Sequence, residues 1–259
     1  MRMMKKVLGT VTVLALSVSL LAGCGSTAAS PVSSAASTAA ESATSSVVSE
    51  TTSAAADENE AAAAQLLNDL TGSYQELWPV ILADEYKQTW LDDCTALVGE
   101  DNAEAAFEQL SSMETGEDNG EDAVKAYANG GGAYFCGFTN SLATLTFDGE
   151  TSTISGTDKD GNVLFSHTYH YIGMEPVRGL YEFESDDADS GEFTYFFLAP
   201  DTSAETYHIE FRYGSDAEAL SQYDAGEYAY WLASGISTDC DQTMIDNCIE
   251  LFCTENLAG

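Results

Sequence analysis

The segment "TSTISGTDKDGNVLFSHTYHYI", Thr151 to Ile172, decides the fold class that the sequence predicts. Its β-branched and aromatic residues alternate with polar ones, a pattern typical of strands with one buried face. Asp158 to Asn162 interrupts the alternation with turn-forming residues, so we expect a hairpin there rather than a calcium-binding loop. Six or more short strands separated by turns predict an antiparallel β-barrel. The other strand-like segments follow Gly130 to Gly132 and are AYFCGFTN (133–140), LATLTFDG (142–149), RGLYEFES (178–185), EFTYFFLAP (192–200) and TYHIEFRYG (206–214).

Helical patterns flank the predicted barrel on both sides. Upstream, apolar residues recur at helical spacing over residues 74–98, where Pro79 predicts a helix start or a kink. Residues 102–110 and 121–128 indicate two further short helices, and residues 215–223 and 242–252 indicate a short and a terminal helix downstream. The sequence therefore predicts an α+β fold, with short helices before the barrel and a helix at the C-terminus.

The first residues have the composition of an export signal. Three basic residues precede the uncharged apolar run Val7 to Leu20, and Leu21-Ala22-Gly23-Cys24 follows it. This sequence resembles the lipobox of bacterial lipoproteins. The resemblance implies cleavage before Cys24, a lipid on its sulfur, and a protein anchored to the extracytoplasmic face of the cell membrane rather than spanning it.

Composition divides the chain into three parts. We expect a signal peptide over residues 1–23 and a tether over residues 24–56, because this second stretch is almost wholly Ser, Thr, Ala and Val. Residues 57–259 form the folded domain, with Asp57 as a plausible N-cap of its first helix.

The charge balance excludes nucleic acid as a partner. The full chain has a net charge of −35, and removal of the signal leaves five basic and 43 acidic residues, a net charge of −38. Such a surface repels phosphates and concentrates cations, which suits export as well as a cationic ligand. Hydrolytic motifs such as GxSxG, HExxH and SxxK are absent from the sequence, so we expect no enzymatic activity.

Five cysteines remain after Cys24, and an odd number cannot all pair within the chain. Two of them are five positions apart in the predicted terminal helix, which places their Cα atoms beyond the usual disulfide span. The sequence leaves two alternatives open, one or two disulfides or a set of buried thiols. The five residues are Cys94, Cys136, Cys240, Cys248 and Cys253.

The histidines are the residues that could hold a transition metal. His167 and His170 are three positions apart, so a regular strand places them on opposite faces. His208 and Glu210 are two positions apart and project from one face, as chelating ligands must, although Arg212 on the same face favours an ordinary ion pair. The acidic loop Glu184 to Glu192 could hold calcium weakly through Asp186, Asp187 and Asp189, but the pattern favours a solvated hairpin tip.

Three segments resemble the ZinT/YodA family of zinc-recruiting, lipocalin-like proteins, which also forms the C-terminal domain of AdcA-type zinc-binding lipoproteins. "LTGSYQELWPVILADE" (70–85) is similar to the opening segment of the family, and "VRGLYEFES" (177–185) is similar to one of its strands. "FFLAPDTSAETYHIEFRYGSD" (196–216) is similar to a segment that runs His-x-x-Ala-Pro, a short loop and His-x-His.

The resemblance implies a calycin-type barrel with zinc bound in its mouth by three histidines. Those positions fall on Phe196, His208 and Glu210, so one ligand is lost, one is kept and one is exchanged. Candidates for a third ligand are His170, His167 or a carboxylate of a neighbouring strand, and we include His170 in the predicted site. Two functions follow: a lipid-anchored protein that delivers zinc to the substrate-binding protein of a metal importer, or a lipocalin-like binding or adhesion module that has lost the metal and carries an apolar cavity.

Overall fold

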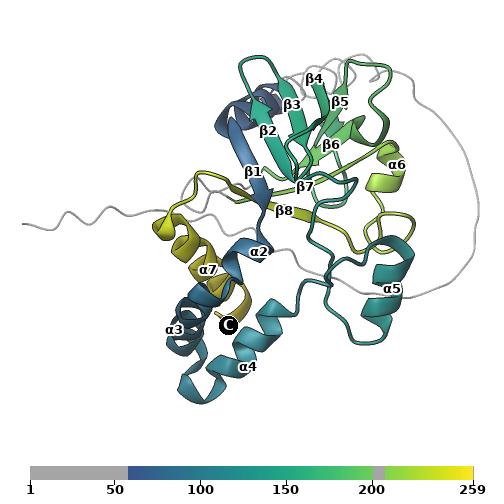
Figure 1. Ribbon diagram of the computed structural model, residues 1–259. Helices are drawn as coiled ribbons and strands as arrows, with labels where there is room; N and C mark the ends of the chain where they lie inside the picture. Colours follow the sequence, from purple (N-terminus) through teal and green to yellow (C-terminus); the bar gives the residue numbers. More distant parts are fainter. Residues whose placement is uncertain (1–57, 201–207, 259) are drawn as a thin grey trace, which may run out of the picture. The chain divides into compact units, whose positions relative to one another are not determined.

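Eight strands close into a barrel in the computed structural model, which describes residues 58–200 and 208–258 (Figure 1). These residues belong to one compact unit, Ser46–Gly259. Each strand pairs antiparallel with the next, and β1 also pairs with β8, so the barrel is an up-and-down meander. The predicted α+β class and the lipocalin-like antiparallel barrel are confirmed. The strands are β1 (Gly72–Glu76), β2 (Thr144–Asp148), β3 (Thr153–Thr157), β4 (Val163–Met174), β5 (Tyr181–Ser185), β6 (Tyr195–Leu198), β7 (His208–Gly214) and β8 (Ala233–Ser237).

Two of these strands were not predicted, and one predicted strand does not form. β1 continues directly into a helical pattern, and β8 has the sequence Ala-Ser-Gly-Ile-Ser, which shows no alternation because four of its five residues are buried. The segment 133–140 makes only isolated bridges, including one between Phe135 and Trp231. Its backbone hydrogen bonds run to residues 113–115 and to residues 230–234, and they do not form a regular ladder.

Most of the helices lie between β1 and β2 and not before the barrel. A helix also covers residues 58–69, just before β1. Pro79 stands in the first turn of α2, where its missing N–H costs nothing, so it marks a helix start. The terminal helix α7 begins at Asp241, whose side chain accepts a hydrogen bond from the Met244 N–H at 3.0 Å. The helices are α2 (Trp78–Ile81), α3 (Lys87–Val98), α4 (Glu100–Ser111), α5 (Gly120–Ala128), α6 (Ala217–Leu220) and α7 (Gln242–Leu257), with 3₁₀ turns at Asp84–Tyr86 and Gly191–Phe193.

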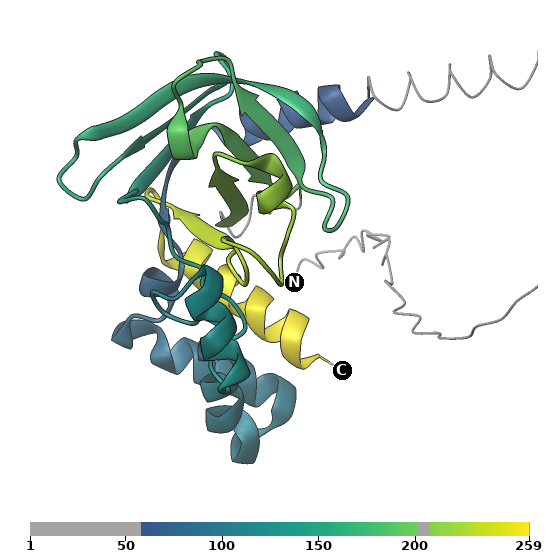
Figure 2. The same cartoon turned by 90° about the vertical axis from the view of Figure 1, so that its right-hand side faces the viewer.

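Two hydrophobic cores hold the unit together. The first fills the barrel, and the second lies between the helices and the outer face of β8, where α2, α3, α4 and α7 gather at one end of the barrel (Figures 1 and 2). The Trp90 indole anchors the second core, because it is fully buried and donates to the Ile81 carbonyl at 2.7 Å.

The five cysteines of the described chain are all free thiols, and four of them are buried. Cys248 and Cys253 share α7 and are not bonded to each other, as the helical spacing predicts. The closest pair joins α3 to α7, with the sulfur atoms of Cys94 and Cys253 at 3.8 Å. Of the two alternatives that the sequence leaves open, the structure has the buried thiols.

The N-terminal predictions lie outside the described residues. They comprise the signal peptide, the lipid site at Cys24, the tether and the N-cap at Asp57. Within residues 58–200 and 208–258, every helix is too short or too polar to cross a membrane.

Arg212 of β7 fastens the long connection to β8 onto the barrel wall. Its side chain is fully buried and donates to the carbonyls of Leu220, Gln222 and Tyr228. Its guanidinium also lies 4.3 Å from the ring centre of Tyr223. One side chain therefore holds three points of a connection that has little regular structure of its own.

We expect Arg212→Met to destabilise the fold by about 3 kcal/mol or more, because two buried carbonyls and one partly buried carbonyl lose a charged donor. The free energy of unfolding in urea measures this loss. Lys125→Met is the matched control, because Lys125 makes an exposed pair with Asp122 and its replacement should leave the stability nearly unchanged. Equal stabilities of the two variants would contradict the role given to Arg212.

Candidate functional site

His208 and Glu210 lie on the outer face of the barrel wall. Along β7, Ile209 and Phe211 belong to the barrel interior, and alternation turns His208 and Glu210 the other way. The His208 ring packs against Phe252 of α7, with the ring centres 5.9 Å apart. The two residues thus share a face, and it is the face that meets the helices.

Phe196, the position that the resemblance gives to the first zinc ligand, is inside the barrel. It is fully buried, and its ring centre lies 5.3 Å from that of Tyr213 and 5.4 Å from that of Tyr169. The wall separates this position from His208 and Glu210, since residues of opposite parity face opposite sides of a sheet. One metal ion could not contact the Phe196 position and both of the others.

His170 is far from His208 along the barrel. Across the sheet, His170 is paired with Glu184 of β5, then with Tyr195 of β6 and finally with Gly214 of β7. On β7, therefore, the residue level with His170 is Gly214, six positions from His208. Six positions of a strand span about 20 Å. The structure therefore brings His208 and Glu210 together but does not bring His170 to them.

The two histidines of β4 face opposite sides, as their spacing predicts. His167 turns inward, stacks on Phe165 at 5.9 Å and lies 2.7 Å from an Asp187 carboxylate oxygen. His170 is exposed and lies 2.8 Å from an Asp186 oxygen. Two aspartates of the acidic loop Glu184 to Glu192 thus contact histidines.

The described residues do not fit the zinc or calcium that the sequence suggested. Across residues 58–200 and 208–258, no group of three or more His, Cys, Asp or Glu side chains is arranged to hold a metal ion. A tight zinc site needs three or four protein ligands. His208 and Glu210 supply two.

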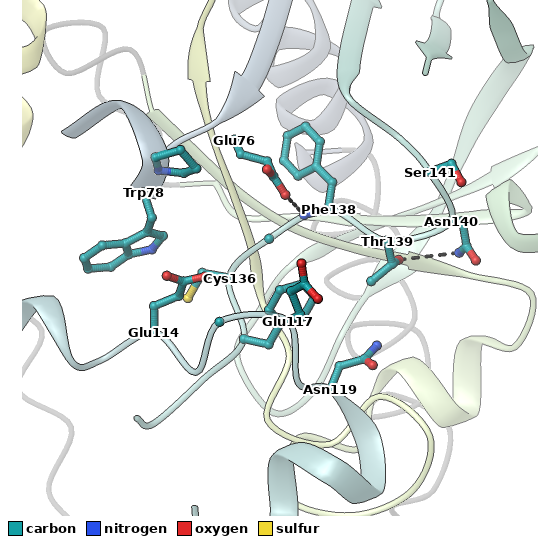
Figure 3. A pocket seen from close by; sticks show the side chains of 14 residues that line it. Glu76, Trp78, Glu114, Glu117, Asn119, Cys136, Phe138, Thr139, Asn140 and Ser141 are labelled. Carbon is teal, nitrogen blue, oxygen red and sulfur yellow. Dashed lines mark hydrogen bonds between the residues drawn. The ribbon is translucent and has the colours of Figure 1, made fainter. Parts of the chain in front are cut away.

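A pocket of about 510 Å³ lies where β1 ends and α2 begins (Figure 3). Its walls come from three stretches of chain: the β1–α2 junction, the loop after α4, and residues 135–141. In Figure 3 the side chains of Glu76, Glu114 and Glu117 surround the same space, and Trp78 and Cys136 lie beside Glu114. Within the described chain, no lysine, arginine or histidine lines this pocket.

The pocket is rigidly built along residues 135–139. The Phe138 N–H donates to a Glu76 carboxylate oxygen at 2.6 Å, and the Trp231 indole donates to the Gly137 carbonyl at 2.9 Å. Gly137 permits this approach, because a Cβ there would stand 2.7 Å from the Phe135 ring and 2.9 Å from the Glu76 carboxylate. The carboxylate of Glu76 is therefore fixed at one wall.

The negative charges of the pocket have no basic side chain of the described residues beside them. Burial, and secondarily the charge of Glu76, raise the pKa of the Glu114 carboxyl. Burial raises the pKa of the Cys136 thiol to about 12, with Glu114 and Glu210 acting in the same direction. Burial is the larger cause of both shifts, and the smaller contributions of the neighbouring carboxylates indicate a region of negative potential that favours positive charge.

The Trp78 indole is buried at the same wall. Its side chain is 4% exposed, and solvent does not reach its N–H. The N–H lies close enough to the Cys136 sulfur to lower the pKa of that thiol. Trp78 therefore closes this end of the pocket and offers no free donor to a ligand there.

No pattern in the sequence selects these residues. Glu76 and Trp78 stand in a stretch whose pattern indicated helix, and Glu114 is one of 43 acidic residues. The Trp78-Pro79 pair at a helix start is the one local signal, and it indicates the junction without indicating a pocket.

Comparison with known proteins gives matches among solved structures alone. No protein family matches the chain, and no curated protein does. The Zn(II)-bound ZinT-like domain of Streptococcus pneumoniae AdcA is similar at 16% identity and a TM-score of 0.45, over 71% of this chain and 89% of that one. Zn(II)-bound AdcA from Streptococcus pneumoniae is similar at 16% identity and a TM-score of 0.41, over 74% of this chain and 35% of that one.

These structures are of the family that the sequence motifs resemble. At this identity and these TM-scores, the likeness gives no residue-by-residue correspondence. The zinc belongs to those proteins, and the site of this chain has to be argued from its own residues.

We expect Glu114→Gln to stabilise the fold at pH 7, because the raised pKa means that the folded state holds this proton more tightly than the unfolded state. The ionised carboxylate therefore costs stability as the pH rises above the ordinary value of 4.5. A melting temperature higher by about 2–4 °C at pH 7, and a smaller difference at pH 4, would show this. The exposed Glu150→Gln serves as the control, and an equal gain there would contradict the local origin.

Proposed function

We propose that the chain is a lipid-anchored, extracytoplasmic binding protein that captures cationic ligands. The lipobox-like sequence ending at Cys24 supports the anchor, and the Ser/Thr/Ala-rich residues 24–56 support a tether between anchor and barrel. The strongly acidic chain raises the local concentration of cations. Binding, not catalysis, is the activity of this arrangement.

The pocket at the end of β1 is the observation that carries this function. Three glutamates surround it, no basic side chain of the described chain lines it, and two of the glutamates are close enough for Glu76 to raise the pKa of Glu114. Carboxylates held together in this way are costly unless a cation joins them. The barrel interior supports no comparable site, because aromatic rings such as Phe196 and Tyr213 are packed across it.

Zinc recruitment is the second candidate function. The observation in its favour is that His208 and Glu210 project side by side from the outer face of β7. In this candidate the anchored protein passes zinc to the substrate-binding protein of an importer. Further ligands would have to join these two residues for tight binding.

We expect calorimetric titration of the lipid-free chain from Gly25 to separate the candidates. At about 0.15 M salt, where non-specific attraction is screened, an alkylammonium salt or a divalent cation should bind one-to-one. Binding should be lost in the Glu114→Gln/Glu117→Gln double variant, which leaves the hydrogen bond of Glu76 intact, and kept in His208→Ala and Glu210→Ala.

The alternative outcomes are equally clear. Tight zinc binding that disappears in His208→Ala and in Glu210→Ala would support zinc recruitment and contradict cation capture in the pocket. No saturable binding of any cation would contradict both functions.

We expect Cys24→Ser to release the protein from the membrane, because lipidation needs the thiol. Fractionation of cells that express the full chain, followed by detection in membrane and soluble fractions, measures the shift. Cys240→Ser is the control, since Cys240 lies in the folded part and should not alter the fractionation. Retention of the Cys24→Ser chain in membranes would contradict the lipid anchor.

A further inference from the structure

Two buried thiols meet between the helices α3 and α7. Cys94 belongs to α3 and Cys253 to α7, both side chains are fully buried, and their sulfur atoms lie 3.8 Å apart. The two helices pack on each other, and both thiols belong to the second hydrophobic core. The residues are 159 positions apart in the chain, so the fold alone brings them together.

The contact has the arrangement from which a disulfide can form. The two sulfur atoms of a disulfide are about 2.05 Å apart, so the thiol contact has to shorten by about 1.8 Å, a movement shared between two side chains. Cys248 cannot make the same bond to Cys253, because both residues stand on one helix. The sulfur of Cys136 lies instead against the Tyr134 carbonyl, at 3.9 Å. Cys94 and Cys253 are therefore the pair that the fold places for a bond.

The order of the elements along the chain gives an oxidant access to this pair. Burial raises the pKa of both thiols, and the thiolate is the form that attacks a disulfide, so the packed helices keep the pair unreactive. α7 is the last helix of the chain, and Cys253 lies near its end. The thiols therefore react before α7 settles on α3, and the packed core then shields the bond from reductants.

We infer that Cys94 and Cys253 become joined by a disulfide when the chain folds in an oxidising compartment, which ties α7 covalently to α3. One cysteine thiolate attacks a sulfur of an external disulfide and releases one thiol of that oxidant. The second cysteine then displaces the other half. The protein loses two electrons and two protons, and the external disulfide is reduced to two thiols. This inference goes beyond the proposed function and needs from it the extracytoplasmic location alone.

The bond would stabilise the helices beside the pocket. It closes a loop of 159 positions, and a long closed loop restricts the unfolded chain strongly. Phe252, next to Cys253, packs against Trp78 with the ring centres 5.3 Å apart. Trp78 lines the pocket at the end of β1. The disulfide therefore holds in place the helix that packs behind this wall.

The test refolds the lipid-free chain from Gly25 out of urea, starting from the fully reduced state. One half refolds in a buffer of oxidised and reduced glutathione, and the other half refolds with a reducing agent. Free thiols are alkylated and counted by mass spectrometry, and digested peptides are mapped. We expect five alkylated cysteines in the reduced chain, two fewer in the oxidised chain, and a linked peptide that contains Cys94 and Cys253.

Melting temperatures measure the effect on stability. The oxidised chain should melt about 5–10 °C above the reduced chain. Cys253→Ala should abolish both the linked peptide and this difference. Cys248→Ala is the matched control, because Cys248 is equally buried on the same helix, and it should keep both. Each variant is compared with itself under the two conditions, so the packing that a variant loses cancels. If Cys253→Ala does not fold, the linked peptide of the unaltered chain still decides.

Three results would overturn the inference. They are five free thiols after refolding in glutathione, a linked peptide that joins other cysteines while Cys94 and Cys253 stay alkylated, and an oxidised chain that melts no higher than the reduced one. The bond and the capture of cations can fail separately, because the thiol count does not depend on any ligand.

Discussion

The pairing of β1 with β8 is the constraint on which the rest of the structure depends. Gln75 faces Ile236 across this seam, so the two ends of the folded chain close one barrel. The Leu77 N–H then donates to the Ser234 carbonyl at 3.0 Å, which fixes the direction in which the chain leaves β1. The helices that follow are thereby placed against the outer face of β8, and the second hydrophobic core and the pocket both form at that junction.

Strand alternation determines which side chains lie on each face of the barrel wall. The inner face carries rings that fill the interior, including Phe196, Phe211 and Tyr213. The outer face of the same strands carries His208, Glu210 and Arg212, and the helices or the β7–β8 connection cover it. Side chains of the inner face and side chains of the outer face therefore cannot bind the same ion or molecule, because the barrel wall separates them.

The sequence was informative where alternation was regular, and uninformative elsewhere. The pattern of β4 predicted both its hairpin and the opposite orientations of His167 and His170. β8 escaped prediction because both of its faces are buried, so small and apolar residues replace the alternation. The pocket could not be predicted, since acidic residues occur throughout this chain and its walls come from stretches that only the closed barrel brings together.

The late position of β8 in the chain has a consequence for the order of folding. The two sides of the seam are 161 positions apart at Gln75 and Ile236, a long-range contact of the kind that slows folding. Until residues 233–237 are available, β1 and β7 each present an open strand edge, and such edges pair readily with other chains. The terminal helix α7 follows immediately, packs on α3 and shares the second hydrophobic core with Ile236, so the last part of the chain both removes these edges and buries the outer side of β8 at Ile236. A chain shortened by its last thirty or so residues would lack β8 and α7, and would be an open sheet prone to self-association rather than a slightly smaller barrel.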